Sequence, residues 1–84
     1  MPNPARGTTL LRFTVPAEQE VTLAAFDVQG RQVRALRSGA HSPGAYSVTW
    51  DFTSDGGSRL PAGVYLVKLT AGDQVFTQRV IRVQ

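Results

Sequence analysis

Few residues in this chain could carry acid, base or nucleophilic chemistry. Among 84 residues there is one histidine, His41, followed directly by Ser42, and there is no cysteine. A hydrolytic site would need a serine that the histidine activates, an acid that orients the histidine, and an oxyanion hole. His41 stands in a Ser-Pro-Gly-containing segment typical of a solvated loop, and no G-x-S-x-G elbow is present. We therefore expect His41 to be an exposed loop residue and the chain not to be an enzyme.

Carboxylates are equally sparse and stand at turns or strand ends, where water keeps them ionised. They are Glu18, Glu20, Asp27, Asp51, Asp55 and Asp73. A glycosidase would need a pair about 5–10 Å apart, with one pKa raised by burial. Asp51 and Asp55 share one segment and carry the oxygen ligands that calcium prefers, but no later acid closes a binding loop. We predict no metal and no cofactor, and leave calcium at the Asp51–Asp55 segment open.

Charge and hydropathy argue against two further classes of protein, those that bind nucleic acid and those that span a membrane. Nine basic and six acidic residues give a net charge of +3, without any run of like charge. Arg31, Arg34 and Arg37 come closest to a basic stripe, but in a regular strand Arg34 would face away from the other two. No apolar run approaches the roughly 20 residues that a membrane span needs. We expect no nucleic-acid binding and no membrane span.

Apolar periodicity predicts strands throughout one domain, residues 1–84. The runs lie at residues 11–15, 21–25, 32–36, 46–50, 64–69 and 75–83. Proline- and glycine-containing turns separate them, and no window shows a helical apolar stripe. The run Val64–Leu69 is almost wholly apolar, which favours a strand covered on both faces. An all-β sandwich or barrel follows.

The alternation also predicts a core. Its expected members are Leu11, Phe13, Val21, Leu23, Val48, Trp50, Val64 and Leu66. Phe26 and Phe52 fall out of phase or in a loop, so they are the better candidates for exposed rings. The long irregular stretch from Asp51 to Gly63 is of a length that carries function or folds back on itself.

One turn has a clear mechanism. Asp27-Val28-Gln29-Gly30-Arg31 joins two strands, and Gly30 can take the positive φ that closes a tight hairpin. Asp51, directly after Trp50, can accept backbone N–H groups as the chain leaves its strand.

The pattern as a whole resembles the C-terminal sorting domains of the type IX secretion system, and the Ig-like domain of the flagellar hook-capping protein. The matching blocks are Pro2–Pro4 with Thr9–Pro16 for "PNP … T-x-I-x-F-x-x-P", Phe26–Val33 for "Y-D-x-x-G-R-x-V", Gly44–Asp51 for "G-x-h-x-V-x-W-D", Leu60–Leu69 for "x-x-S-G-V-Y-x-x-x-L", and Arg79–Val83 for the closing strand. Ala62 replaces the usual serine, and arginine stands where lysine is frequent at the end. The structural motif residues that the resemblance marks are Asp27, Gly30, Arg31, Trp50, Asp51, Gly63 and Tyr65.

The resemblance implies an Ig-like antiparallel two-sheet β-sandwich of about seven strands, from the C-terminus of a larger secreted bacterial protein. It implies a non-catalytic module for secretion sorting and attachment at the outer membrane exterior. The implied partners are secretion or cell-surface machinery and covalently linked upstream domains. With the composition of the last strand, it makes Arg79, Arg82 and Val83 candidates for partner recognition. Two alternatives remain: a structural Ig-like module of a capping or scaffold protein, and a carbohydrate-binding accessory module of a secreted glycoside hydrolase.

Overall fold

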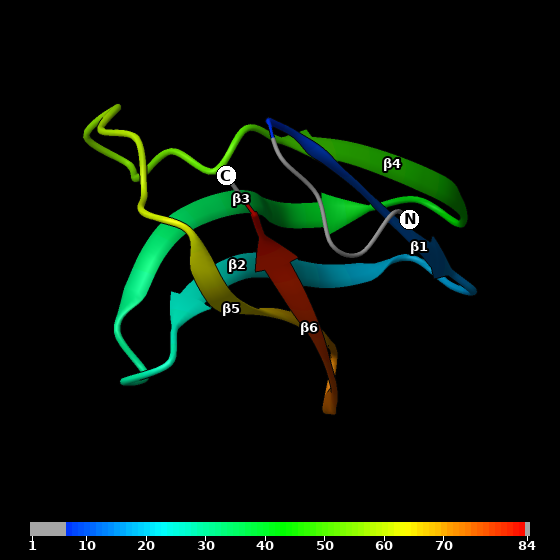
Figure 1. Cartoon of the computed structure of the whole chain (residues 1–84). Coiled ribbons are helices and arrows are strands. Elements are labelled where there is room, and N and C mark those ends of the chain that lie inside the picture. The colour runs from blue at the N-terminus through cyan, green and yellow to red at the C-terminus, as the bar shows by residue number, and fades with distance from the viewer. Residues whose placement is uncertain (1–6, 84) are drawn as a thin grey trace.

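A computed structural model describes residues 7–83 as two antiparallel sheets, so the Pro2–Pro4 block lies outside the described residues. The strands are β1 (Thr9–Val15), β2 (Gln19–Asp27), β3 (Gln32–His41), β4 (Gly44–Trp50), β5 (Gly63–Ala71) and β6 (Gln74–Arg82). β1 pairs with β4, and the larger sheet has the order β3-β2-β5-β6 (Figure 1). In this part of the chain no helix is long and apolar enough to span a membrane. The all-β prediction is confirmed, with six described strands where about seven were expected.

The core lies between the two sheets and is centred on aromatic rings. Its buried members are Leu11, Leu23, Ala25, Trp50, Phe52, Tyr65, Val67 and Val80. Leu11, Val21, Leu23 and Trp50 are buried as predicted. Phe13 and Val48 are partly buried and pack against this cluster. A core of this size accounts for the fold without disulfides, because burial of apolar surface is the main favourable term in folding.

The predicted phase of β5 is wrong. Tyr65 and Val67 are buried, whereas Val64 and Leu66 are only half-buried. The run is apolar at nearly every position, so alternation could not choose between its faces. Packing across the core decides which face of β5 is buried, because the Tyr65 ring contacts the Trp50 ring edge-on, with centroids 5.7 Å apart.

The predicted exposure of Phe52 is also wrong. Phe52 is 0% exposed, and its ring centroid lies 4.6 Å from that of Trp50. Its φ of 58° is the one positive value of a non-glycine residue in the described chain. Such a backbone conformation costs on the order of 1–3 kcal/mol. Burial of the ring offsets that cost, because a fully buried aromatic side chain contributes about 1.5–3 kcal/mol.

Two bulges shape β3. Leu23 pairs with Arg37 and Ala24 with Ala35, which leaves Leu36 as an extra residue between them. A second register shift leaves Val33 unpaired in the same way. Both extra residues pack against the core. The expectation that Arg34 simply faces away from its neighbours assumed a regular strand, and the bulges remove that regularity.

Candidate functional site

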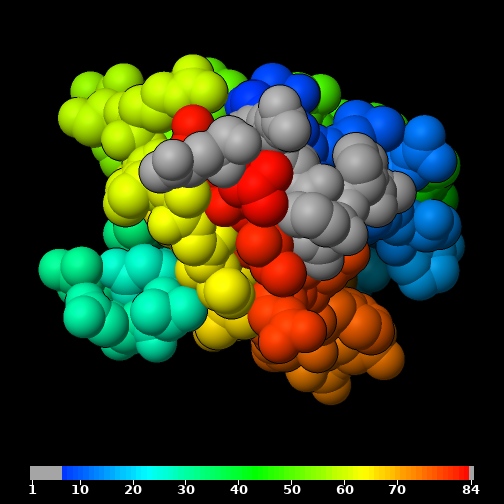
Figure 2. Space-filling view, in the orientation of Figure 1, coloured from blue at the N-terminus to red at the C-terminus, as the bar shows by residue number. Residues whose placement is uncertain are grey.

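A cleft opens at the end of the sandwich where three segments meet. These are the β2–β3 hairpin, the β4–β5 loop (residues 51–62) and the start of β5, and the cleft has a volume of about 640 Å³. Figure 2 shows the hollow between the hairpin and the loop at the left of the molecule. We call it the hairpin cleft; its lining residues are Asp27, Val28, Gln29, Arg31, Gln32, Val33, Ser54, Asp55, Gly56, Leu60, Pro61, Ala62, Gly63, Val64 and Tyr65. Four of the motif residues, Asp27, Arg31, Gly63 and Tyr65, thus meet in one place.

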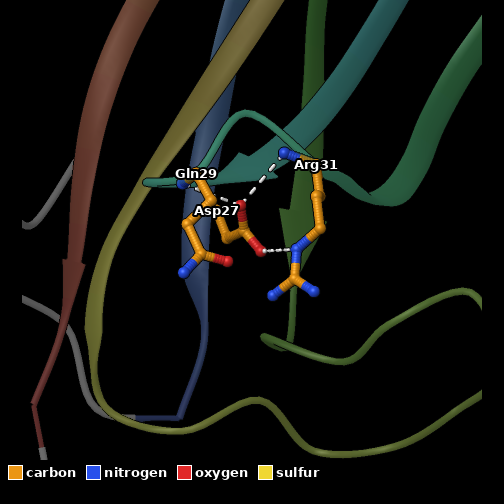
Figure 3. A network of polar contacts seen from close by, with 3 residues as sticks. All are labelled: Asp27, Gln29 and Arg31. Carbon is orange, nitrogen blue, oxygen red and sulfur yellow. Dashed lines mark hydrogen bonds and ion pairs between the residues drawn. The ribbon is translucent and has the colours of Figure 1, made fainter.

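Asp27 organises the hairpin side of the cleft. Its Oδ1 accepts the backbone N–H groups of Gln29 at 2.9 Å and of Arg31 at 3.0 Å. Its Oδ2 accepts the Arg31 Nε–H at 2.9 Å (Figure 3). Gly30 has a φ of 86° and its N–H bonds the Asp27 carbonyl at 3.0 Å, which confirms the predicted positive φ. The motif "D-x-x-G-R" therefore describes a turn whose acid satisfies the backbone and holds the arginine.

The same contacts set the charge of Asp27. The pKa of its carboxyl lies below its ordinary value, first because the Arg31 N–H donates to the charged form, with the Arg31 guanidinium and the Gln29 N–H adding to this. Asp27 is therefore ionised at neutral pH, and the ion pair with Arg31 is intact there.

The β4–β5 loop folds back on itself, which is one of the two outcomes that its length indicated. Ser54 N–H bonds Ser58 O at 2.8 Å, and Leu60 N–H bonds Phe52 O at 2.8 Å. The Trp50 indole N–H donates to Thr53 O at 3.1 Å, which ties the loop to the core. Asp51 accepts from Thr53 N–H at 3.3 Å and from its hydroxyl. The hydroxyl bond is the main reason that the pKa of Asp51 is lowered.

The loop also covers part of the β3 edge, a feature that the sequence did not predict. Asp55 N–H bonds Val33 O at 2.9 Å, and Asp55 Oδ1 accepts Ala35 N–H at 3.0 Å. Arg34 donates to Thr53 Oγ1 at 2.8 Å and to Ser54 O at 3.0 Å. Free sheet edges invite pairing with other chains, so these contacts protect β3. The only signal in the sequence was the length of the loop.

Asp51 and Asp55 are thus used for hydrogen bonds within the loop and to β3. Among the described residues no three acidic, histidine or cysteine side chains gather as a metal site would need. The geometry gives no support to the hypothesis of a calcium site at the Asp51–Asp55 segment.

Tyr65 closes the floor of the hairpin cleft. It is 5% exposed, and its hydroxyl donates to Pro61 O. Burial is the main reason that the pKa of this phenol is raised. Tyr65 therefore stays neutral and keeps the Leu60–Gly63 turn against the sheet.

The candidate recognition residues of the last strand lie at the far edge of the large sheet. Arg79 pairs with Leu66 and is exposed, whereas Arg82 pairs with Gly63 and is half-buried, as is Val83. Arg79 and Arg82 stand an odd number of positions apart on one strand, so they point to opposite faces as expected. None of the three lines the hairpin cleft.

The expectation for His41 is wrong. It ends β3 and is only 9% exposed, and its Nδ1 lies 3.0 Å from Gly39 O. Its ring meets Tyr46 edge-on at 5.0 Å and Phe13 at 6.1 Å between centroids. Pairing of β3 with β2 carries this residue into the sheet, which a Ser-Pro-Gly context did not reveal. It is a packed aromatic side chain.

Phe26 and Phe52, the two rings expected to be exposed, do not form a platform on which a sugar could stack. Phe52 is buried, and the half-buried Phe26 ring lies under the Lys68 ammonium, 5.5 Å from its centroid. Sugars stack on flat exposed rings, so the carbohydrate alternative loses both of its candidates.

The architecture defines the class of protein: an Ig-like antiparallel β-sandwich. The profile of the FlgD Ig-like domain family matches residues 4–74, and the chain belongs to this family. The fold is also similar to part of dimeric latent PorU from Porphyromonas gingivalis, with a TM-score of 0.78 and 23% sequence identity. That likeness covers 98% of this chain and 9% of the PorU chain. No curated protein matches.

Proposed function

We propose that this domain is a non-catalytic module that directs secretion and surface attachment of a larger bacterial protein. The observation that carries the proposal is the size of this domain relative to the PorU chain that it resembles. Almost the whole chain corresponds to one Ig-like unit that makes up 9% of a far longer polypeptide. A unit of this kind acts through what it is joined to and what it contacts. The order of the motif blocks, which resembles that of type IX sorting domains, supports the sorting role.

The state of the polar side chains supports the non-catalytic part of the proposal. His41 packs against the rings of Phe13 and Tyr46. The carboxylates of the turns, Asp27, Asp51 and Asp55, accept hydrogen bonds from the backbone or from neighbouring side chains. Groups that act as general bases need access to substrate and a suitably tuned pKa. Both Asp27 and Asp51 have a lowered pKa, which makes them weaker bases.

The proposed address includes the exposed Arg79 on β6, together with Arg82 and Val83 at its end. The planar fork of an arginine matches a carboxylate, so the proposed partner is one that bears a carboxylate. The partners on this proposal are secretion or cell-surface machinery, and the protein resides at the outer membrane exterior.

The test fuses residues 3–84 to a periplasmic reporter in a host with a type IX secretion system. The intact fusion should reach the cell surface, and Arg79→Ala should retain a larger share in the periplasm. Arg37→Ala, an exposed arginine on β3, is the matched control and should behave as the parent. Truncation after Gln78 is a poor probe, because it removes the fully buried Val80 and would unfold the domain. A folded fusion that stays periplasmic would refute the sorting role.

The family match favours one second candidate, a structural Ig-like module of a capping or scaffold protein. It predicts that the folded fusion is retained in the periplasm and that Arg79→Ala changes nothing.

A further inference from the structure

We propose that the hairpin cleft binds a peptide segment that bears a carboxylate, with Arg31 as the residue that holds the carboxylate. The site goes beyond the sorting role and does not depend on it. The volume of about 640 Å³ falls within the range of roughly 300–1,000 Å³ that ligand sites occupy. The cleft is open at the molecular surface, so a chain segment can enter and leave it (Figure 2).

Arg31 is presented to the cleft in a fixed orientation. Its Nε–H is bonded to Asp27, so the two terminal nitrogens are left at the far edge of the guanidinium. Figure 3 shows that these nitrogens turn away from Asp27. The side chain is 74% exposed, and among the described residues only the Nε–H of this guanidinium has a hydrogen-bond acceptor. A planar pair of parallel N–H donors matches the two oxygens of a carboxylate. Because Asp27 already holds the side chain, less rotamer entropy is lost on binding.

The charges of the cleft favour one carboxylate over a polyanion. Arg31 is the only basic residue among the described residues that line it. Asp27 and Asp55 stand on the same cleft, each engaged in hydrogen bonds. Their charges weaken the attraction of the cleft for any anion, and most strongly for a ligand with several negative charges. A nucleic acid or polyphosphate is therefore a poor occupant, whereas a single glutamate or aspartate side chain suits the arginine.

The apolar part of the lining favours a peptide over a small free acid. Leu60 and Pro61 lie on one side of the cleft, and Val28 and Val33 come from the hairpin and β3. Val28 is 68% exposed, one of the three most exposed large apolar residues described. Apolar side chains that flank the acid would cover this surface, which is a gain that acetate or propionate cannot supply.

The test titrates the isotopically labelled 84-residue chain with a short blocked peptide that has one glutamate between valines. Chemical shifts should move at the amides of Arg31, Gly56 and Ala62 and at Arg31 Nε, with binding in the millimolar range. The glutamine version of the peptide should bind at least about tenfold more weakly, since a charge-assisted forked pair is lost. This comparison needs no variant of the protein. Propionate alone should also bind more weakly than the peptide.

Variants sharpen the assignment. Arg31→Lys keeps the charge but loses the fork and should weaken glutamate-peptide binding by about tenfold. Arg37→Gln removes an exposed arginine outside the cleft and should leave it unchanged. Equal binding of the glutamate and glutamine peptides, shift changes elsewhere on the domain, equal binding by propionate, or no binding at all would each overturn the proposal.

Discussion

Replacement of Trp50 by alanine should bring the domain close to unfolding. Trp50 is 1% exposed and packs against the rings of Phe52 and Tyr65. Removal of such a side chain costs about 3–5 kcal/mol through lost transfer energy and the cavity left behind. The indole N–H also satisfies Thr53 O, and loss of that partner adds about 1 kcal/mol. The total of about 4–6 kcal/mol is set against a stability of about 4–13 kcal/mol for a chain of this length.

The measurement is urea unfolding followed by far-ultraviolet circular dichroism, because the variant has lost the only tryptophan. Trp50→Phe keeps a ring in the core but loses the indole donor, so it should cost less than half as much. Phe76→Ala is the matched surface control, since that ring is 55% exposed, and should cost less than about 1 kcal/mol. A Trp50→Ala variant within about 1 kcal/mol of the parent would show that the aromatic cluster does not hold the core together.

Three further changes test other parts of the structure. Gly30→Ala should lower the melting temperature because Gly30 has a positive φ, and Gly30→Val should lower it further. A side chain at position 30 would clash with nothing, so the loss would come from backbone strain alone. Equal melting temperatures of the parent and the valine variant would contradict this reasoning. Asp27→Asn should have a lower melting temperature than the parent at pH 7, and the two melting temperatures should converge near pH 2. Because folding lowers the pKa of Asp27, its carboxylate stabilises the fold at pH values above the pKa of the unfolded chain. This stabilisation is lost as the pH falls through the pKa of the folded state. A gap that persists in acid would mean that charge is not the cause. His41→Ala should destabilise the domain by about 1–3 kcal/mol in urea unfolding, because a packed ring is lost. An unchanged urea midpoint would contradict the packed position of the His41 ring.

The elements that the sequence predicted well are those set by local chemistry. Apolar runs between turn signals located all six strands, and a glycine after Asp-Val-Gln located the hairpin together with its positive φ. Asp51 accepts the backbone N–H of Thr53, as an acid at a strand end was expected to. Each of these depends on residues a few positions apart, so their types alone are informative.

The errors arose where contacts between distant segments decide. An almost wholly apolar run left the face of β5 undetermined, and Tyr65 turned inward because Trp50 stands across the core. Phe52 lies in a loop and was expected to be exposed, but a left-handed backbone at that position delivers its ring to the same cluster. His41 was judged by its neighbours in sequence, whereas pairing with Gln19 placed it in the sheet.

Some features of the candidate site likewise follow from local sequence, and others depend on contacts between distant segments. The sequence by itself determined that the chain is an all-β module, that Asp27, Gly30 and Arg31 form one turn, and that Gly63 and Tyr65 belong to a second motif block. Only the tertiary structure brought the two blocks together around one cleft, because antiparallel pairing of β2 with β5 sets Asp27 opposite Tyr65. It also decided that Arg31 faces that cleft while Arg79 lies on a distant sheet edge. Register between strands far apart in sequence depends on the summed packing of both sheets, and no single segment encodes it.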